Sequence, residues 1–544
     1  MAISAVVTEA SSTVLNTFSS TPTSTTASTV AALVVTLFSI IIIFSKLQRK
    51  RDSAFKNLPL PPGPAPWPLL GCIPEFLVHK ANFRWIHQLM KEMNTEIACI
   101  RLGNNTHLVP VTCPEIAREI CKKNDAAFAN RPPTIFTELA TRLLTPVFSN
   151  DEQWKKLRRM LIAEVASSAR LRWLHDKRAE EADNLVFYVH NQCKANKSVD
   201  LRLVTRFYAA NVIRKITLGV RNFGKGMPDG GPGPEELEHV EAIFVVVKYI
   251  YSFSISDYLP SVLAGLDLDG QQKLVKQINR LIGKYHDPII NERIKQWKSG
   301  ERKDIEDTLD IFITLKDPST GQPFLSFEEI RYQILELFLA GLDNPSNIVE
   351  WTLGEMINRP ELMKKAQEEI DRVVGKDRLV QESDIRELNF VKACARESFR
   401  LHPMSAFNIP HMSSQDTEVA GYYIPKGSQA LLSRYGLGRN PKVWADPLKY
   451  DPERHMNDGD VSLLENDLRF ISFSSGARGC IGGVMGTYMT VIMLARLVQC
   501  FDWSAPTSKG IDLTEPDEEP LCPAIPVVAI AKPRLPSHVY PTSN

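Results

Sequence analysis

The sequence predicts a mainly α-helical protein with small β-sheets, built as one large domain behind an N-terminal membrane anchor. Three observations support this fold class. Apolar residues recur at three- and four-residue spacing over most of the chain. Strand-like runs are few and short. One long uncharged apolar run stands near the N terminus, and no internal repeat or second low-complexity linker divides the rest of the 544 residues.

Composition excludes several classes of protein. The chain carries 64 Lys plus Arg against 63 Asp plus Glu, a net charge of +1, so it lacks the basic excess of nucleic-acid-binding proteins and no nucleic acid is expected as a partner. Its nine cysteines are scattered without a CxxC pair. That pattern disfavours a disulfide framework or a structural zinc site, and it fits a reducing, cytosolic compartment.

The N-terminal region predicts a membrane anchor. Residues 1–26 are rich in Ser, Thr and Ala, which predicts a disordered tail. The next 18 residues, 27–44, carry no charge and approach the roughly 20 residues that a membrane-spanning helix needs, so we expect a transmembrane helix over 27–45. A cleaved signal peptide is the alternative, but the run is long, lies far from the first residue and has no basic residue ahead of it.

Residues 46–71 predict how the body meets the membrane. Four basic side chains in KLQRKR, residues 46–51, follow the apolar run, and basic residues stay on the cytoplasmic side. We therefore expect the tail in the lumen and the body in the cytosol. Six prolines then crowd LPLPPGPAPWPLLG, residues 58–71, which predicts a semi-rigid, extended hinge ahead of a globular domain over 72–544.

Periodicity predicts the elements of the body. Helices are expected where apolar residues repeat at helical spacing, which happens over 151–166, 173–194, 235–256, 268–299, 327–357, 360–374 and 384–402. Short strand-like runs are expected to pair as hairpins, and they lie over 96–103, 106–112, 417–425 and 428–434.

The longest predicted helix, over 328–360, contains an irregular turn. Two small residues and three unusual ones stand there: Ala340, Gly341, Asp343, Asn344 and Pro345. Pro345 has no N–H to donate to the Gly341 carbonyl, so we expect the helix to bend or widen and something to bind against the gap. The alternative is that one helix ends at Leu342 and that Asp343 caps the next.

Charged residues recur in two further patterns. Glu397 and Arg400 stand three apart on one helical face in ARESFRLHP, and DPERH supplies Arg454 in a loop; they form either a weak surface pair or a buried network that fixes the loop. Trp154 and Arg158 stand four apart in EQWKKLRRM. That pair suits two carboxylates, although a solvated basic face with one anchoring tryptophan is equally compatible.

The stretch FSSGARGCIGG, residues 473–483, predicts a loop folded around a large group. Gly476, Gly479 and Gly482 surround Cys480 at even spacing, and Arg478 stands two positions before it. Glycines let a backbone approach a bulky group closely, and an arginine beside a thiolate can pair an anion, so the stretch favours a large, flat, acidic ligand. On this stretch alone, a structural or redox-active cysteine is the alternative.

Taken in order, these patterns resemble the microsomal cytochrome P-450 family of haem-thiolate monooxygenases over residues 58–535. The resemblance implies a haem b cofactor whose iron takes the Cys480 thiolate as its axial ligand. The rest of the cysteine motif is matched by Phe473, Gly476, Arg478 and Gly482. The resemblance further implies that Trp154, Arg158, Arg478 and His411 hold the haem propionates, and that a structural network supports the cysteine loop through Glu397, Arg400 and Arg454.

One departure from the family pattern points to a subgroup. Most members carry a threonine where this chain has Asn344 followed by Pro345, and relatives that rearrange peroxides also depart there. DNPSN at 343–347 and PERH at 452–455 are, however, similar to the plant amino-acid N-hydroxylases, which make aldoximes. The resemblance therefore implies a catalytic role for Asp343, Asn344 and Pro345 in oxidation of an amine.

The resemblance also implies the reaction and its setting. NADPH–cytochrome P-450 reductase would deliver electrons from NADPH, and with O₂ the enzyme would N-hydroxylate an L-amino acid twice. Loss of water and carbon dioxide then leaves the aldoxime, which would feed glucosinolate or related defence metabolism through downstream aldoxime-metabolising monooxygenases. The expected location is the endoplasmic reticulum membrane, with a single span and a cytosolic catalytic domain.

The substrate is only partly indicated. The likeness to tryptophan- and phenylalanine-type members, including Phe407 and Asn408, favours an aromatic amino acid, with other apolar amino acids open. Arg131 in FANRPPT is the candidate for the substrate carboxylate, and a structural ion pair is its alternative. Two other functions stay open: a monooxygenase that hydroxylates a different hydrophobic small molecule, and a non-catalytic haem protein.

Overall fold

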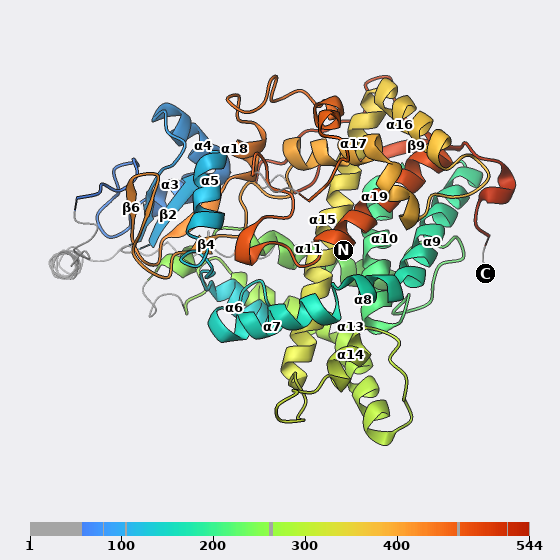
Figure 1. Ribbon diagram of the computed structural model, residues 1–544, viewed down its shortest axis with the longest axis horizontal. Coiled ribbons are helices and arrows are strands. Elements are labelled where there is room, and N and C mark those ends of the chain that lie inside the picture. Colours follow the sequence, from blue (N-terminus) through green and yellow to red (C-terminus); the bar gives the residue numbers. More distant parts are fainter. Residues whose placement is uncertain are drawn as a thin grey trace, which may run out of the picture.

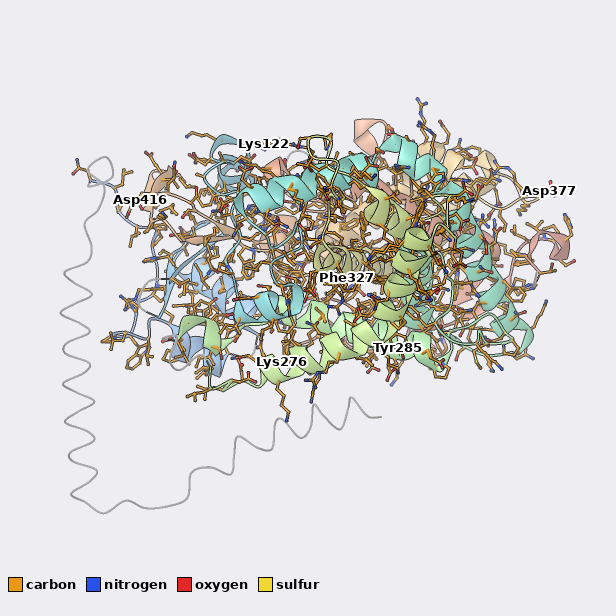
Figure 2. The ribbon with its side chains drawn as sticks, turned by 90° about the horizontal axis from the view of Figure 1, so that it is seen from below. Lys122, Lys276, Tyr285, Phe327, Asp377 and Asp416 are labelled. Carbon is orange, nitrogen blue, oxygen red and sulfur yellow. The ribbon has the colours of Figure 1, made fainter. Side chains whose placement is uncertain are left out.

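The larger sheet lies towards one end of the long axis of the molecule, and most of the long helices lie towards the other (Figure 1). The computed structural model describes residues 57–542 apart from Lys80, 104–105, 260–264, 465–467 and 519–520. The predicted tail and membrane anchor, residues 1–45, and the basic cluster 46–51 lie outside the described residues. Seen from below, Asp416 and Asp377 mark the β-rich end and the helical end (Figure 2).

The β-rich end is built on a four-stranded sheet in the order β1–β2–β7–β4. Strand β1 (Ile100–Leu102) pairs antiparallel with β2 (Thr106–Val111), as predicted. Strand β2 pairs in parallel with β7 (Gln429–Leu432), and β4 (His411–Met412) pairs antiparallel with β7. At the helical end a three-stranded sheet joins β3 (Val199–Asp200), β9 (Val528–Pro533) and β8 (Phe501–Ser504).

The prediction that 417–425 pairs with 428–434 is wrong. The first run folds on itself instead, as β5 (Thr417–Val419) against β6 (Tyr422–Ile424). Both residues of the turn have positive φ, 52° at Ala420 and 77° at Gly421, which is the geometry of a tight two-residue hairpin. Since this turn joins the two halves of the run to each other, β7 is left to extend the larger sheet.

The proline-rich segment lies against the β-rich end. The Pro59 carbonyl accepts from the Tyr423 N–H and the Pro62 carbonyl from the Cys99 N–H, both at 2.8 Å. A Cβ on Gly63 would stand 1.9 Å from the Cys99 carbonyl oxygen, so the two backbones touch where only glycine fits. The segment is extended and is held on the body by its carbonyls, the only hydrogen-bonding groups that prolines offer.

The helices predicted from periodicity are present, with small shifts at their ends. They are α7 (Asp151–Glu164), α9 (His175–Lys194), α11 (Pro234–Ile250), α13 (Gln271–Ser299), α15 (Phe327–Asn358), α16 (Pro360–Val373) and α17 (Asn389–Leu401). Shorter α-helices connect them: α3 (Ile73–Val78), α4 (Asn82–Glu92), α5 (Pro114–Arg118), α6 (Ile135–Thr141), α8 (Ser168–Trp173), α14 (Thr308–Thr314) and α18 (Arg434–Gly438). The mainly α-helical class with small sheets is thereby confirmed.

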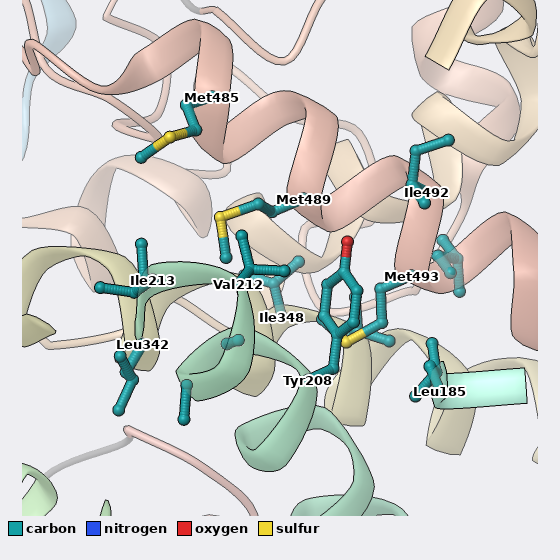
Figure 3. Close-up of a cluster of buried hydrophobic side chains, with 14 of the residues drawn as sticks. Leu185, Tyr208, Val212, Ile213, Leu342, Ile348, Met485, Met489, Ile492 and Met493 are labelled. Carbon is teal, nitrogen blue, oxygen red and sulfur yellow. The ribbon is translucent and has the colours of Figure 1, made fainter. Parts of the chain in front are cut away.

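Two core helices were not predicted, α10 (Leu201–Leu218) and α19 (Gly483–Cys500). Both are buried on nearly every side, so their apolar residues form no stripe of helical period. Figure 3 shows Met489 of α19 next to Val212 of α10, and Leu342 of α15 next to Ile213 of α10. Helix α19 and the segment Pro234–Tyr258 are long and apolar enough to cross a membrane, but 72% of α19 is buried within the domain, as expected of a core helix.

Helix α15 passes through the middle of the domain (Figure 1). It begins at a capping box, in which Ser326 accepts from the Glu329 N–H and Glu329 accepts from the Ser326 N–H. At Gly341 it touches α10 so closely that a Cβ would stand 2.4 Å from the Ile213 side chain. This contact fixes the irregular turn at 340–345 in the centre of the domain.

Candidate active site

A cavity of about 270 Å³ lies between α15 and the loop 473–483. Apolar side chains form much of its wall, among them Phe148, Leu161, Val247, Ile250 and Met404. On the α15 side the wall is thin, because Ala340 is exposed to the cavity although it lies in the middle of a core helix. The pair of small residues in the sequence therefore marks an opening in the packing.

The loop 473–483 turns Cys480 towards this cavity. The Cys480 N–H donates to the Phe473 carbonyl at 2.8 Å and closes the loop. Gly476 has a φ of 73°, and a Cβ there would stand 2.2 Å from the Cys121 carbonyl oxygen, so the turn requires glycine. The thiol is exposed to the cavity yet lies deep within the protein. It can therefore bind a ligand in the cavity while remaining shielded from bulk water.

Phe473 and Gly482, two further residues of the motif, differ in what surrounds them. Phe473 packs on the start of α19, where a Cβ on Gly486 would meet its ring at 3.0 Å, and its ring lies 5.6 Å from that of Phe399. A Cβ on Gly482, by contrast, would meet no protein atom within 4 Å. Packing explains Gly486, whereas Gly482 borders open space that a ligand can fill.

The Cys480 thiol needs a positive partner to ionise. Burial raises its pKa, while the Gly482 N–H and the Arg158 guanidinium lower it. Arg158 also donates to the Gly479 carbonyl at 2.9 Å, which ties α7 to the cysteine loop. A metal ion at the sulfur would remove the remaining penalty, because a coordinating thiol is deprotonated outright.

Arg478 is the most firmly held cation of the site. It donates to the backbone carbonyls of Ala129, Pro146 and Ser149 and to the Asn150 side chain. Its guanidinium lies 4.2 Å from the centre of the Trp154 ring. Burial, together with the charges of Arg131 and Arg158, lowers its pKa to about 9. The indole thus covers one face of a guanidinium that the backbone positions.

Three other arginines border the cavity beside Arg478: Arg131, Arg158 and Arg434. Arg131 donates to the Ile409 and Pro410 carbonyls, and burial lowers its pKa to about 10. Arg434 donates from Nη2 to Asn408 at 3.0 Å, but its buried Nε and Nη1 have no hydrogen-bond partner. Four buried or half-buried cations therefore converge on one cavity.

This set of residues fits haem. Among the described residues none of the four arginines forms an ion pair with a carboxylate, and N–H groups of Arg131 and Arg434 are left unsatisfied. A group with two carboxylates beside a metal that binds a thiolate would complete both halves of the site. His411 is buried beside them and hydrogen-bonds the Phe128 carbonyl through Nδ1 at 3.1 Å. Its Nε2 faces Asn408.

Glu397, Arg400 and Arg454 come together away from the cavity. Arg400 donates to both oxygens of Glu397 at 2.7 Å, Arg454 donates to Oε1 at 3.1 Å, and His455 lies 2.8 Å from Oε2. Glu397 and Arg400 are fully buried. Burial alone would raise the pKa of Glu397, but the hydrogen bonds from Arg400 and His455 outweigh it and lower the pKa to about 2. The residues form a buried network, and a weak surface pair is excluded.

The irregular turn of α15 stays helical. The helix continues from Phe327 to Asn358 through Pro345, so the alternative in which Asp343 caps a second helix is wrong. The Asn344 amide donates back to the Ala340 carbonyl at 3.2 Å, and Asn347 donates to Asp343 at 2.7 Å. These side-chain bonds support the turn in which Pro345 lacks an N–H. Asp343, Asn344 and Pro345 all line the cavity.

The residues predicted to contact substrate lie in different places. Asn408 lines the cavity and also donates to Ser474 at 3.2 Å, and Arg131 lines it on the side of Arg478. The Phe407 ring instead stacks on His87 at 5.3 Å and does not border the cavity. Sequence reasoning missed Arg434 and Glu336, which do line it; each is a charged residue in an apolar run, in ALLSRY and ILELFL.

Comparison of the sequence with known proteins identifies a family and several relatives. A sequence model of the cytochrome P-450 family matches residues 61–527. Valine N-monooxygenase 1 of Manihot esculenta is 60% identical, over 94% of this chain and 95% of its own length. Tryptophan N-monooxygenase 1 of Arabidopsis thaliana is 52% identical over 93% of each chain. Phenylalanine N-monooxygenase of the same plant is 52% identical over 94% of this chain and 98% of its own.

Proposed function

Because the chain belongs to the cytochrome P-450 family, we propose that it is a haem-thiolate monooxygenase that N-hydroxylates an L-amino acid twice and yields the aldoxime. The observation that carries the proposal is the cavity in which the Cys480 thiol and the α15 turn Ala340–Pro345 border the same space. Relatives named as N-monooxygenases of valine, tryptophan and phenylalanine support the amino-acid substrate.

Haem would be held by the residues that surround the cavity. Cys480 would bind the haem iron through its thiolate, next to the open space beside Gly482, and Phe473 would pack beside the sulfur. Trp154, Arg158, Arg478 and His411 would face the propionates. Arg131 and Arg434 are cationic and unsatisfied in the same region, so we assign them to the carboxylate groups of haem as well. When bound, a thiolate-ligated haem supplies activation of O₂ with electrons from NADPH.

The residues of the chain then orient the substrate and its water. The α15 turn leaves the Gly341 carbonyl without its helical donor, because Pro345 has no N–H. That carbonyl and the Asn344 amide can hold a water molecule at the cavity wall. Apolar side chains from α7 and α11 exclude bulk water from the same space. After two N-hydroxylations, loss of water and carbon dioxide gives the aldoxime.

An aliphatic amino acid such as valine is the substrate that we propose. The aromatic preference inferred from sequence depended in part on Phe407, which stacks outside the cavity. The two relatives named for valine are 60% and 58% identical, against 51–54% for those named for tryptophan and phenylalanine. Apolar residues of the cavity wall, Val247 and Ile250 from α11 and Leu339 from α15, could contact such a side chain.

A membrane setting completes the proposal. We propose a single N-terminal span over 27–45 in the endoplasmic reticulum, a cytosolic catalytic domain and NADPH–cytochrome P-450 reductase as the electron donor. The aldoxime would pass to downstream aldoxime-metabolising monooxygenases, in glucosinolate or related defence metabolism. Protease added to sealed microsomes should degrade the domain, and protection of the domain would contradict the topology.

The test of the activity is a substrate screen. The full chain, reconstituted with reductase, NADPH and O₂, is incubated with each of the twenty amino acids, and aldoxime and NADPH consumption are measured. Aldoxime from an apolar amino acid, valine foremost, supports the proposal. Oxygenation of a non-amino-acid compound without aldoxime would favour a different monooxygenase. Haem binding without NADPH consumption would favour a non-catalytic haem protein.

A further inference from the structure

Glu336 is a buried carboxylate that borders the cavity and has no cation. It is 4% exposed and lies on α15 among apolar residues. Among the described residues it forms no ion pair. The neighbouring hydroxyl of Thr145 lowers its pKa, but that hydroxyl makes no hydrogen bond of ordinary geometry. An isolated buried carboxylate is strongly disfavoured unless a cation or several donors accompany it.

Other buried acids of the domain are compensated. Glu397 has Arg400, Arg454 and His455, and Glu350 has Arg202. Glu369 accepts two backbone N–H groups. Asp343, the other acid that borders the cavity, accepts from Asn347, and the charge of Arg206 lowers its pKa against the effect of burial. Glu336 therefore differs from these acids in facing the substrate space without a positive partner.

The position of Glu336 on α15 suits the reacting end of a substrate. Residues 336, 340 and 344 follow one another at four-residue spacing, so they lie along one face of the helix. Ala340 opens that face to the cavity, and Asn344 stands at the irregular turn. A group bound by Glu336 thus lies on the same wall as the turn assigned to N-oxidation.

We propose that Glu336 binds the ammonium group of the amino-acid substrate and thereby selects amino acids over apolar compounds of the same shape. The inference rests on the proposed function and adds to it the residue that recognises the amine. An ammonium has three N–H donors and a positive charge, which supplies what the carboxylate lacks. Without ligand, burial raises the pKa of Glu336 to about 7, as expected for a buried carboxylate that has no cation beside it.

The alternative role of Glu336 is structural, through the hydroxyl of Thr145. The loop that carries Thr145 is already fixed to α15 by Gln333, whose amide donates to the Leu144 carbonyl at 2.6 Å. The two roles separate by substitution. Glu336→Gln keeps the shape and an acceptor oxygen for Thr145 but removes the charge, whereas Thr145→Val removes the hydroxyl and keeps the charge.

The experiment measures ligand affinity of the haem-loaded full chain by calorimetry. The probes are L-valine, its amine 2-methylpropylamine, and its des-amino acid 3-methylbutanoate. Glu336→Gln should weaken L-valine and the amine by about 10- to 100-fold, the scale of a hydrogen bond to a charged group. Binding of 3-methylbutanoate, the haem content and the melting temperature should stay unchanged. Thr145→Val should leave the ratio of valine to 3-methylbutanoate affinity unchanged.

Two outcomes would overturn the inference. One is wild-type affinity for L-valine in Glu336→Gln, and the other is an equal loss for all three probes, which indicates a structural role. If Glu336→Gln fails to fold, Glu336→Asp retains the charge and should still prefer valine to 3-methylbutanoate; loss of that preference overturns the inference too. Failure of the proposed function is distinguishable, because wild-type protein would then form no aldoxime and bind no amino acid.

Discussion

Two buried clusters of charge in this domain differ in how they are balanced. In the network around Glu397, each charged group has an oppositely charged partner at 2.7–3.1 Å. Around the cavity, backbone carbonyls hold Arg131, Arg158 and Arg478, and the Asn408 side chain holds Arg434. Glu336 borders the same cavity without an ion-pair partner among the described residues. Charges that are paired within the protein stabilise the fold. Buried charges without an opposite charge favour binding of a ligand that supplies it. Substitutions in the two clusters should therefore affect different measurements.

The largest effect is expected at Cys480. Cys480→Ser should abolish the thiolate signature of the reduced carbon-monoxide complex entirely, because a hydroxyl does not replace the soft, anionic sulfur ligand. The spectrum is recorded after reconstitution with haem. Cys193→Ser, at the half-buried end of α9, is the control and should keep the signature. A thiolate spectrum in Cys480→Ser would refute the ligand assignment.

A loss of stability is expected in the balanced network. Glu397→Gln leaves Arg400 and Arg454 buried without their carboxylate, and removal of one partner of a buried ion pair destabilises by about 3–5 kcal/mol. Urea unfolding measures the change. Glu368→Gln on the exposed face of α16 removes a surface pair with Lys364 and should change stability by less than about 1 kcal/mol. An equal loss of unfolding free energy in the two variants would mean that the buried network stabilises the fold no more than a surface ion pair does.

The pH dependence of stability should carry the same signature. Glu397 has a folded-state pKa of about 2, below its ordinary value near 4.5, so it contributes stability above pH 4.5 that is lost as the pH falls towards 2. At about 1.4 kcal/mol per pKa unit, the full contribution is about 3 kcal/mol. Unfolding curves of wild type and Glu397→Gln should converge across this window. A constant difference between them would mean that the carboxylate titrates normally.

Removal of one of the arginines around the cavity should lower the affinity for haem. Arg158→Gln removes a cation that borders the cavity, and haem affinity should fall about 10- to 100-fold, as for loss of a charge-assisted hydrogen bond of about 1.5–3 kcal/mol. Haem transfer to apomyoglobin measures it. Arg159→Gln, the exposed neighbour on α7, is the matched control. Equal haem affinity in both variants would remove Arg158 from the haem site.

The smallest effect is expected at the α15 turn. Asn344→Thr removes the amide that donates to Ala340, and Pro345→Ala restores an N–H for Gly341 and straightens the helix. Each change involves one hydrogen bond of about 0.5–1.5 kcal/mol, so aldoxime formed per NADPH should fall by up to about tenfold, with more peroxide released. If both variants form as much aldoxime per NADPH as the wild type, Asn344 and Pro345 have no catalytic role and only affect packing.

The sequence predicted most helices and the cysteine loop, and its failures have physical reasons. Helices α10 and α19 were missed because burial on all sides removes the amphipathic stripe on which periodicity depends. The 417–434 hairpin was wrong because a two-residue turn at Ala420 and Gly421 competed with the longer connection. Glu336 and Arg434 were missed because their distinguishing property, a buried charge without a partner, exists only after distant segments are packed together.

The helical geometry of α15 also fixes the distance and the angle between Glu336 and the irregular turn. Glu336 and Asn344 are eight residues apart, so a straight helix holds them about 12 Å apart and on one face. Substituting an apolar residue between them changes the cavity wall by a few atoms. Deleting one residue rotates Glu336 by about 100° about the helix axis and shifts it by about 1.5 Å relative to the turn. The span between the two residues is therefore far more sensitive to its length than to its composition.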